Sequence, residues 1–251
     1  MTHILTLDEQ CIDLPFSDSP AQVARSFAEF FEGWVKERQG PLHIALSGGS
    51  TPAVLYRLWA AEFADLMDWE QLHFYWGDER CVPPDDEESN YKMADDLFLS
   101  PLQIPSCNIH RMRGELPPEA EAGRYGEELK DNLPLINGLP VFDLIILGMG
   151  GDGHTASIFP GQMELLQSQE ICALAKHPVS GQERITLTGP VINNARTVVF
   201  LVTGKSKQER LQEILGEGGE RAQQYPAAHI KPAHGQLHWF LDQQAAHKVS
   251  V

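Results

Sequence analysis

Cysteine is scarce in this sequence, and no two cysteines lie close together. The four are Cys11, Cys81, Cys107 and Cys172, and none forms a Cys-x-x-Cys pair. This spacing argues against a zinc site and against the disulfide framework of a small secreted protein. We therefore expect free thiols, a reducing cytoplasmic environment and no bound metal.

Long apolar runs and basic charge are also lacking. No apolar run approaches the roughly 20 residues that span a bilayer, and residues 1–15 lack the basic and apolar regions of a signal peptide. Acidic residues outnumber basic ones by 35 to 19, which gives a formal net charge of −16. Such a chain should repel nucleic acid and anionic membranes, so we expect neither as a partner. A small anionic ligand would need a local cluster of cations.

The chain has no linker, low-complexity segment or internal repeat, so its 251 residues indicate one α/β domain spanning 1–251. A helix is expected after Ser19, and 77–91 is expected to be a long acidic loop. Strand-like runs occur at 42–46, 73–76, 141–147, 183–188, 197–204 and 237–241. Because helical patterns separate most of them, we predict a mostly parallel, Rossmann-like open sheet with helices on both faces. A monomer or a small homo-oligomer is expected.

Four of these strand-like runs end in unusual polar sequences. They are SGGST at 47–51, GDER at 77–80, GMGGDGH at 148–154 and TGKSK at 203–207. Each alone is compatible with an ordinary turn. Ligands of parallel α/β sheets bind at the carboxyl ends of the strands, so we expect the four segments to meet in one site.

The first segment has the chemistry of an anion site. Gly48, Gly49, Ser50 and Thr51 precede a predicted helix, whose free N–H groups and dipole favour a bound phosphate. The segment lacks the Lys-Ser/Thr ending of a nucleotide P-loop. The candidate cations for the same anion are Arg80, Arg184, Lys205 and Lys207.

The third segment contains Gly148-x-Gly150-x-x-Gly153, the glycine spacing of a dinucleotide-binding fold. Pro160 and Gly161 follow too soon for the helix that this fold requires. His154 is instead a candidate general base, with the Asp152 carboxylate to fix its tautomer. The backbone amides of Gly150 and Gly151 are candidate donors to an oxyanion.

The blocks SGGSTP, WGDERCVPPDDEESNY, FDLIILGMGGDGHTASIFPG and LVTGKSK together resemble the glucosamine-6-phosphate isomerase/6-phosphogluconolactonase family. The resemblance implies a glucosamine-6-phosphate deaminase-like fold and hydrolysis of 6-phosphoglucono-1,5-lactone in the oxidative pentose phosphate pathway, without metal or organic cofactor. It assigns catalytic positions to His154, as the base, and to Asp78, and it places Arg80 among the substrate-binding residues. The SGGST loop, Arg184 and Lys207 match phosphate-binding positions, and Lys205 is close enough to share this role.

Three alternatives remain from the sequence. The first is a deaminase or isomerase on the same scaffold, but Phe159 stands where the resemblance to those enzymes would place a carboxylate. The second is a non-catalytic sugar-phosphate sensor, although the chain has no basic DNA-binding extension. The third is a nicotinamide dehydrogenase, which the glycine spacing alone supports.

Overall fold

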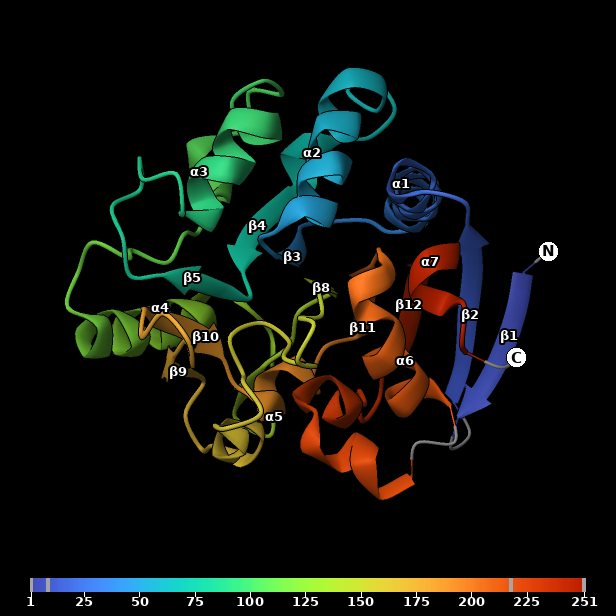
Figure 1. Ribbon diagram of the computed structural model, residues 1–251. Coiled ribbons are helices and arrows are strands. Elements are labelled where there is room, and N and C mark those ends of the chain that lie inside the picture. The colour runs from blue at the N-terminus through green and yellow to red at the C-terminus, as the bar shows by residue number, and fades with distance from the viewer. Residues whose placement is uncertain (1, 8–9, 217–218, 250–251) are drawn as a thin grey trace.

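A seven-stranded sheet forms the centre of the computed structural model, which describes residues 2–7, 10–216 and 219–249 (Figure 1). Its strand order is β1-β2-β12-β11-β8-β3-β4. Every neighbouring pair is parallel except β1 and β2. The strands are β1 (Thr2–Leu7), β2 (Gln10–Ser17), β3 (Leu42–Leu46), β4 (Leu72–Trp76), β8 (Leu144–Leu147), β11 (Thr197–Val202) and β12 (Gln236–Asp242). The prediction of a mostly parallel α/β sheet is confirmed.

Helices cover both faces of this sheet, as expected. Ile44 packs in one hydrophobic cluster with residues of α1 (Pro20–Lys36), α2 (Ser50–Glu62) and α3 (Asn90–Ala94), which continues into a π-helical turn, Asp95–Leu99. Its neighbour Ala45 packs in the other cluster with α4 (Pro118–Asn132), α5 (Gly189–Ile192), α6 (Gln208–Leu215) and α7 (Gln243–Ala246). Successive side chains of a strand point to opposite faces, so apolar strands can build both cores.

Short 3₁₀ turns connect many of these elements. They are Trp69–Gln71, Ser106–Asn108, Met163–Gln167, Lys205–Lys207, Gly219–Gln224 and Pro226–His229. In the described part of the chain, no helix is long and apolar enough to cross a membrane.

A second, antiparallel sheet lies beside the central one, in the order β5-β10-β9 (Figure 1). It contains β5 (Asp78–Arg80), β9 (Cys172–Lys176) and β10 (Glu183–Leu187). The expected loop at 77–91 therefore begins with a strand, and that prediction was wrong there. The short connection between β9 and β10 allows only antiparallel pairing, since a parallel pair needs a longer crossover. A third, two-stranded sheet pairs β6 (Leu135–Ile136) with β7 (Leu139–Pro140).

The first helix begins where the sequence predicts. Ser19 is extended, and its side chain accepts a hydrogen bond from the backbone N–H of Gln22, while Pro20 occupies the first turn. Serine at this cap position typically contributes about 1 kcal/mol. Phe27 and Phe31 of this helix are completely buried against the sheet. The cap and the apolar face thus fix where the helix begins and how it packs.

Three half-buried histidines lie near the start of β3 and β4. His43 and His73 are opposite each other in register, with ring centroids 5.4 Å apart. His73 Nδ1 is 3.2 Å from His110 Nε2, and His110 Nδ1 is 3.2 Å from a Glu128 carboxylate oxygen. Burial lowers the pKa of His43, against the opposing charge of Asp143. Burial, followed by the charges of His43 and His110, lowers the pKa of His73.

These shifts predict acid sensitivity. The unfolded chain binds protons at these imidazoles more readily than the folded chain, so the free energy of unfolding should fall as the pH drops below the ordinary value of 6.5. The double substitution His43→Gln/His73→Gln should flatten this dependence between about pH 7 and pH 5, as measured by urea denaturation. The exposed His234 provides the control His234→Gln. An unchanged pH dependence in the double variant would contradict the prediction.

Candidate active site

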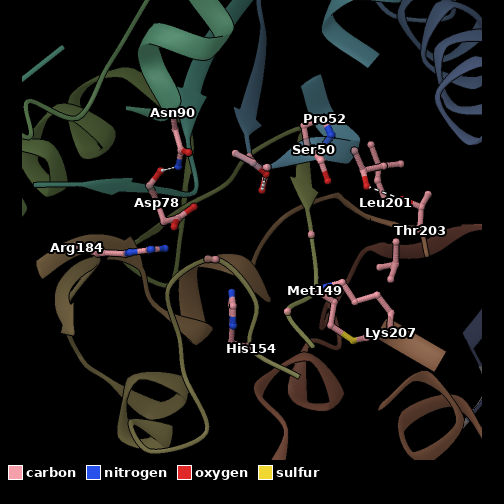
Figure 2. A pocket seen from close by; sticks show the side chains of 18 of the residues that line it. Ser50, Pro52, Asp78, Asn90, Met149, His154, Arg184, Leu201, Thr203 and Lys207 are labelled. Atoms are coloured by element: carbon pink, nitrogen blue, oxygen red, sulfur yellow. Dashed lines mark hydrogen bonds between the residues drawn. The ribbon is translucent and has the colours of Figure 1, made fainter. Parts of the chain in front are cut away.

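A pocket of about 230 Å³ lies at the carboxyl ends of β3, β4, β8 and β11. Residues 47–52, 148–150 and 201–203 line it, together with Asp78, Arg80, Asn90, His154, Ala156, Arg184 and Lys207. Figure 2 shows Asp78, Asn90 and Arg184 on one side and Ser50, Thr203 and Lys207 on the other, with His154 between them. All four polar segments predicted from the sequence therefore meet here.

The loop after β3 presents the open end of α2. Gly49 caps this 13-residue helix without any side-chain hydrogen bond, at a φ of 104° that favours glycine. The first N–H groups of the helix, at Ser50 and Thr51, therefore lack the partner that a capping side chain would supply. Thr51 Oγ1 lies 2.8 Å from Thr203 Oγ1, which joins the loop to the end of β11. This corner can donate several hydrogen bonds to one anion.

Two arginines face each other across the second sheet. Arg80 of β5 and Arg184 of β10 are opposite in register, and both line the pocket. Each has a buried Nε without a hydrogen-bond partner. Burial lowers the pKa of Arg184, with Asp78 opposing and Arg80 reinforcing the shift. Like charges directly opposite each other are unfavourable, so a bound anion would relieve this arrangement.

The two candidate lysines separate in the structure. Lys207 lines the pocket and is half-buried, and burial lowers its pKa against the opposing charge of Asp152. Lys205 is exposed and lies outside the lining. Both belong to the 3₁₀ turn Lys205–Lys207, which places their side chains differently. The prediction that Lys205 shares the phosphate role has no support from this geometry.

His154 is held by Asp152. His154 Nδ1 lies 2.6 Å from an Asp152 carboxylate oxygen, which also accepts the backbone N–H of His154 at 3.2 Å. Burial disfavours the Asp152 carboxylate, but its hydrogen bonds to His154 and the charge of that ring outweigh burial and lower its pKa to about 2. The carboxylate thus keeps the proton on Nδ1 and leaves Nε2 free to act as a base.

Gly150 provides the space for this pair. A Cβ at Gly150 would lie 2.2 Å from His154 Nδ1 and 2.4 Å from the Asp152 carboxylate, which real contacts do not allow. The ring of His154 also packs against the ring of Phe159, with the two ring centroids 4.8 Å apart. The glycine therefore serves close packing of the histidine rather than binding of a dinucleotide.

The expected oxyanion donors do not fit the structure. The N–H of Gly150 donates to the carbonyl oxygen of His154 at 2.9 Å, so that prediction was wrong: the amide is used in closing the turn. Gly151 is exposed and lies outside the pocket lining. Residues 148–162 form turns with one bridge between Thr155 and Ile158, so the helix of a dinucleotide-binding fold does not follow these glycines.

Sequence reasoning missed two residues around Asp78. Ser157 is completely buried, and its hydroxyl donates to the Asp78 carboxylate at 2.6 Å. Asn90 donates from Nδ2 to the Asp78 carbonyl oxygen at 2.9 Å and lines the pocket. Asn90 lies 12 positions and Ser157 lies 79 positions from Asp78 in sequence, and neither has a spacing that marks it. In the described residues, no group of three His, Cys, Asp or Glu side chains is placed to hold a metal ion.

The fold and the pocket define an α/β enzyme whose pocket brings together three cations, an open helix end and a histidine–carboxylate pair. The chain belongs to the family described as glucosamine-6-phosphate isomerases/6-phosphogluconolactonase, whose model matches residues 17–239. It is 48% identical to a 6-phosphogluconolactonase of Haemophilus influenzae over 206 residues, which is 82% of this chain and 86% of that protein. It is 44% identical to the Treponema pallidum 6-phosphogluconolactonase over 202 residues, 80% of this chain and 83% of that protein.

A solved structure agrees with this assignment. The 6-phosphogluconolactonase of Trypanosoma brucei matches with a TM-score of 0.86 and 29% sequence identity. The match covers 94% of this chain and 98% of that one. Similarity in sequence and in fold therefore extends over almost the whole domain.

The different positions of the two lysines predict different effects on anion binding. Lys207→Met should weaken binding of inorganic phosphate about tenfold or more, because a charged hydrogen-bond donor is lost from the pocket. Lys205→Met removes the same charge outside the lining and should change the affinity less than about twofold, since exposed charges are screened. Isothermal titration at constant ionic strength measures both. Equal losses in the two variants would contradict the assignment.

Proposed function

We propose that this protein hydrolyses 6-phosphoglucono-1,5-lactone to 6-phosphogluconate, a step of the oxidative pentose phosphate pathway. The observation that carries the proposal is the His154–Asp152 pair in a pocket with an uncapped helix end and three cations. The relatives named above are 6-phosphogluconolactonases at 44% and 48% identity, which supports the same activity.

His154 acts as the general base in this mechanism. Its Nε2 takes a proton from a water molecule, and the resulting hydroxide attacks the lactone carbonyl carbon. The bond between that carbon and the ring oxygen then breaks, and the protonated His154 returns the proton to the ring oxygen. The products are a carboxylic acid, which ionises, and a free hydroxyl group. Asp152 stabilises the imidazolium that forms between the two steps.

The remaining polar groups hold the substrate. The N–H groups of Ser50 and Thr51 at the start of α2, together with the loop glycines Gly48 and Gly49, contact the phosphate, and Lys207 neutralises it. Arg80 and Arg184 supply further positive charge from the second sheet.

Asp78, whose carboxylate is fixed by Ser157, accepts a hydrogen bond from a sugar hydroxyl. Because these groups lie on rigid strand and helix ends, the lactone carbonyl can be held beside His154.

The alternatives lose support at particular residues. Phe159 packs against His154 where a deaminase or isomerase would need a second carboxylate. The turns at 148–162 leave no place for the helix that a nicotinamide cofactor requires. A non-catalytic sensor would not need the Asp152 bond that frees Nε2 of His154.

We further propose that the chain works as one domain, in the cytoplasm, as a monomer or a small homo-oligomer. Cys81, Cys107 and Cys172 are free thiols, which suits a reducing compartment. The net charge of −16 disfavours nucleic acid and anionic membranes as partners.

Removal of the proposed base tests the mechanism. His154→Ala should lower kcat by about 10²- to 10⁴-fold, the usual range for loss of a general base. Its affinity for 6-phosphogluconate should change only a few-fold, because the phosphate contacts remain. Acid release from freshly prepared lactone, corrected for spontaneous hydrolysis, measures kcat, and titration calorimetry measures binding.

His177 provides a matched control. Its ring also packs against Phe159, with ring centroids 5.4 Å apart, but it is outside the pocket lining. His177→Ala should therefore retain near wild-type kcat. Full activity of His154→Ala would refute the mechanism, whereas ammonia release from glucosamine 6-phosphate by the wild type would favour the deaminase.

The packing of Gly150 gives a second test. Gly150→Ala should lower kcat by roughly 10- to 100-fold, since the new methyl group would displace the His154–Asp152 pair from its position. A methyl group added at Gly161 would meet no heavy atom within 4 Å, so Gly161→Ala is the control. The same lactone assay compares them. A fully active Gly150→Ala enzyme would show that the position of the pair is not critical.

A further inference from the structure

A buried carboxylate lies directly behind the pocket wall. Glu79 is 2% exposed, and its two oxygens accept four hydrogen bonds. The donors are the backbone N–H groups of Arg80, Asn90 and Tyr91, at 2.7 to 2.8 Å, and the hydroxyl of Ser89, at 3.0 Å. Burial raises the pKa of Glu79, and the three backbone bonds oppose this rise. Glu79 thereby fastens residues 89–91 to β5.

Asn90 is the residue that this arrangement presents to the pocket. It occupies the first position of α3, directly after the capping Ser89. Its Nδ2 donates to the Asp78 carbonyl oxygen at 2.9 Å, which can only accept, so the orientation of the amide is fixed. Its Oδ1 is buried and has no hydrogen-bond partner, and the residue as a whole is only 2% exposed. Figure 2 shows the amide above Asp78 on the same side of the pocket.

Gly48 provides the space for this amide. A Cβ at Gly48 would lie 1.8 Å from Asn90 Oδ1, so only glycine allows the contact. Gly48, in the loop that leads to the N-terminus of α2, therefore lies against the acceptor Asn90 Oδ1. A buried acceptor without a partner is unfavourable, so a ligand group that donates a hydrogen bond to it gains affinity.

We propose that Asn90 Oδ1 accepts a hydrogen bond from one ring hydroxyl of the sugar, at C2, C3 or C4, and is a specificity-determining residue of this site. Glu79 is its positioning residue. The inference rests on the proposed function for the identity of the sugar. A phosphate dianion has no proton to donate, so Asn90 Oδ1 cannot bind it. The phosphate is bound by the N–H groups and the cations instead. The Asp78 carboxylate beside Asn90 is a second acceptor for the same face of the sugar.

Binding of deoxy analogues tests the contact without relying on catalysis. The probes are 6-phosphogluconate and its 2-, 3- and 4-deoxy analogues, titrated calorimetrically into the wild type, Asn90→Ala and Asn90→Ser. One analogue should bind the wild type about 10- to 100-fold more weakly than the parent compound. Both Asn90 variants should bind the parent compound more weakly than the wild type does. They should bind the parent compound and that analogue with the same affinity.

Asn108 provides a matched control. It is also a buried asparagine whose Nδ2 donates to backbone carbonyls, those of Glu70 and Leu72, but it lies outside the pocket. Asn108→Ala should keep the wild-type preference among the four compounds. Equal wild-type affinity for all four, or a uniform loss in the Asn90 variants, would overturn the proposal. If a variant does not fold, equal wild-type affinity for all four compounds still overturns the proposal, and the folded one of the two Asn90 variants tests the assignment to Asn90.

The role of Glu79 has its own readout. Glu79→Gln turns an amide N–H₂ toward donors, so it should displace Asn90 and reduce the preference for the intact hydroxyl. Its affinity for inorganic phosphate should fall less than its preference for the hydroxyl, because Lys207 and the N–H groups of Ser50 and Thr51 make no contact with Glu79. Loss of thermal stability with an unchanged preference would overturn the positioning role.

The outcomes separate this inference from the proposed function. A wild type that prefers one hydroxyl through Asn90 but does not hydrolyse the lactone would refute the function and support the contact. If the wild type hydrolyses the lactone but Asn90→Ala keeps the full preference, the function would be supported and the Asn90 contact refuted.

Discussion

Parallel pairing of β3, β4, β8 and β11 is the constraint on which the site depends. It places four loops from distant parts of the chain at one edge of the sheet, where each strand ends. Both faces are covered by helices, so the strands cannot shift without uncovering the cores around Ile44 and Ala45. The second sheet then adds Arg80 and Arg184 from the side. Most of the lining groups are thereby anchored at strand and helix ends, and His154 is held in its turn by Asp152.

Charge is distributed to suit this pocket. The protein carries a net charge of −16, yet three cations face one small cavity. The surrounding acidic surface is screened beyond about 8 Å, whereas contacts inside the cavity are not. An anion therefore gains from close hydrogen bonds more than it loses to the distant field. Specific binding and general repulsion of polyanions are compatible for this reason.

The sequence was sufficient for the parts governed by local rules. The periodicity of α1, the apolar runs of β8 and β11, and the glycine turn before α2 all predict elements that form. The sequence was insufficient where contacts between distant segments determine the local structure. β5 lies in a stretch rich in turn residues and is a strand only because β10 pairs with it. Asn90 is held at the pocket by the hydrogen bond from its backbone N–H to Glu79. The N–H of Gly150 donates within its own turn. The spacing of residues in the sequence reveals neither bond.

The attachment of Glu79 has a consequence for how this protein can vary. The first turn of α3, which carries Asn90, is tied to β5 by the buried Glu79 carboxylate and not only by the segment 81–88 that joins the two in sequence. That segment is itself held at the pocket, because the Arg80 guanidinium donates to the Glu88 carbonyl oxygen and the N–H of Ser89 donates to the Asp86 carbonyl oxygen. Insertions or deletions within it would therefore disturb Arg80 as well as the first turn of α3.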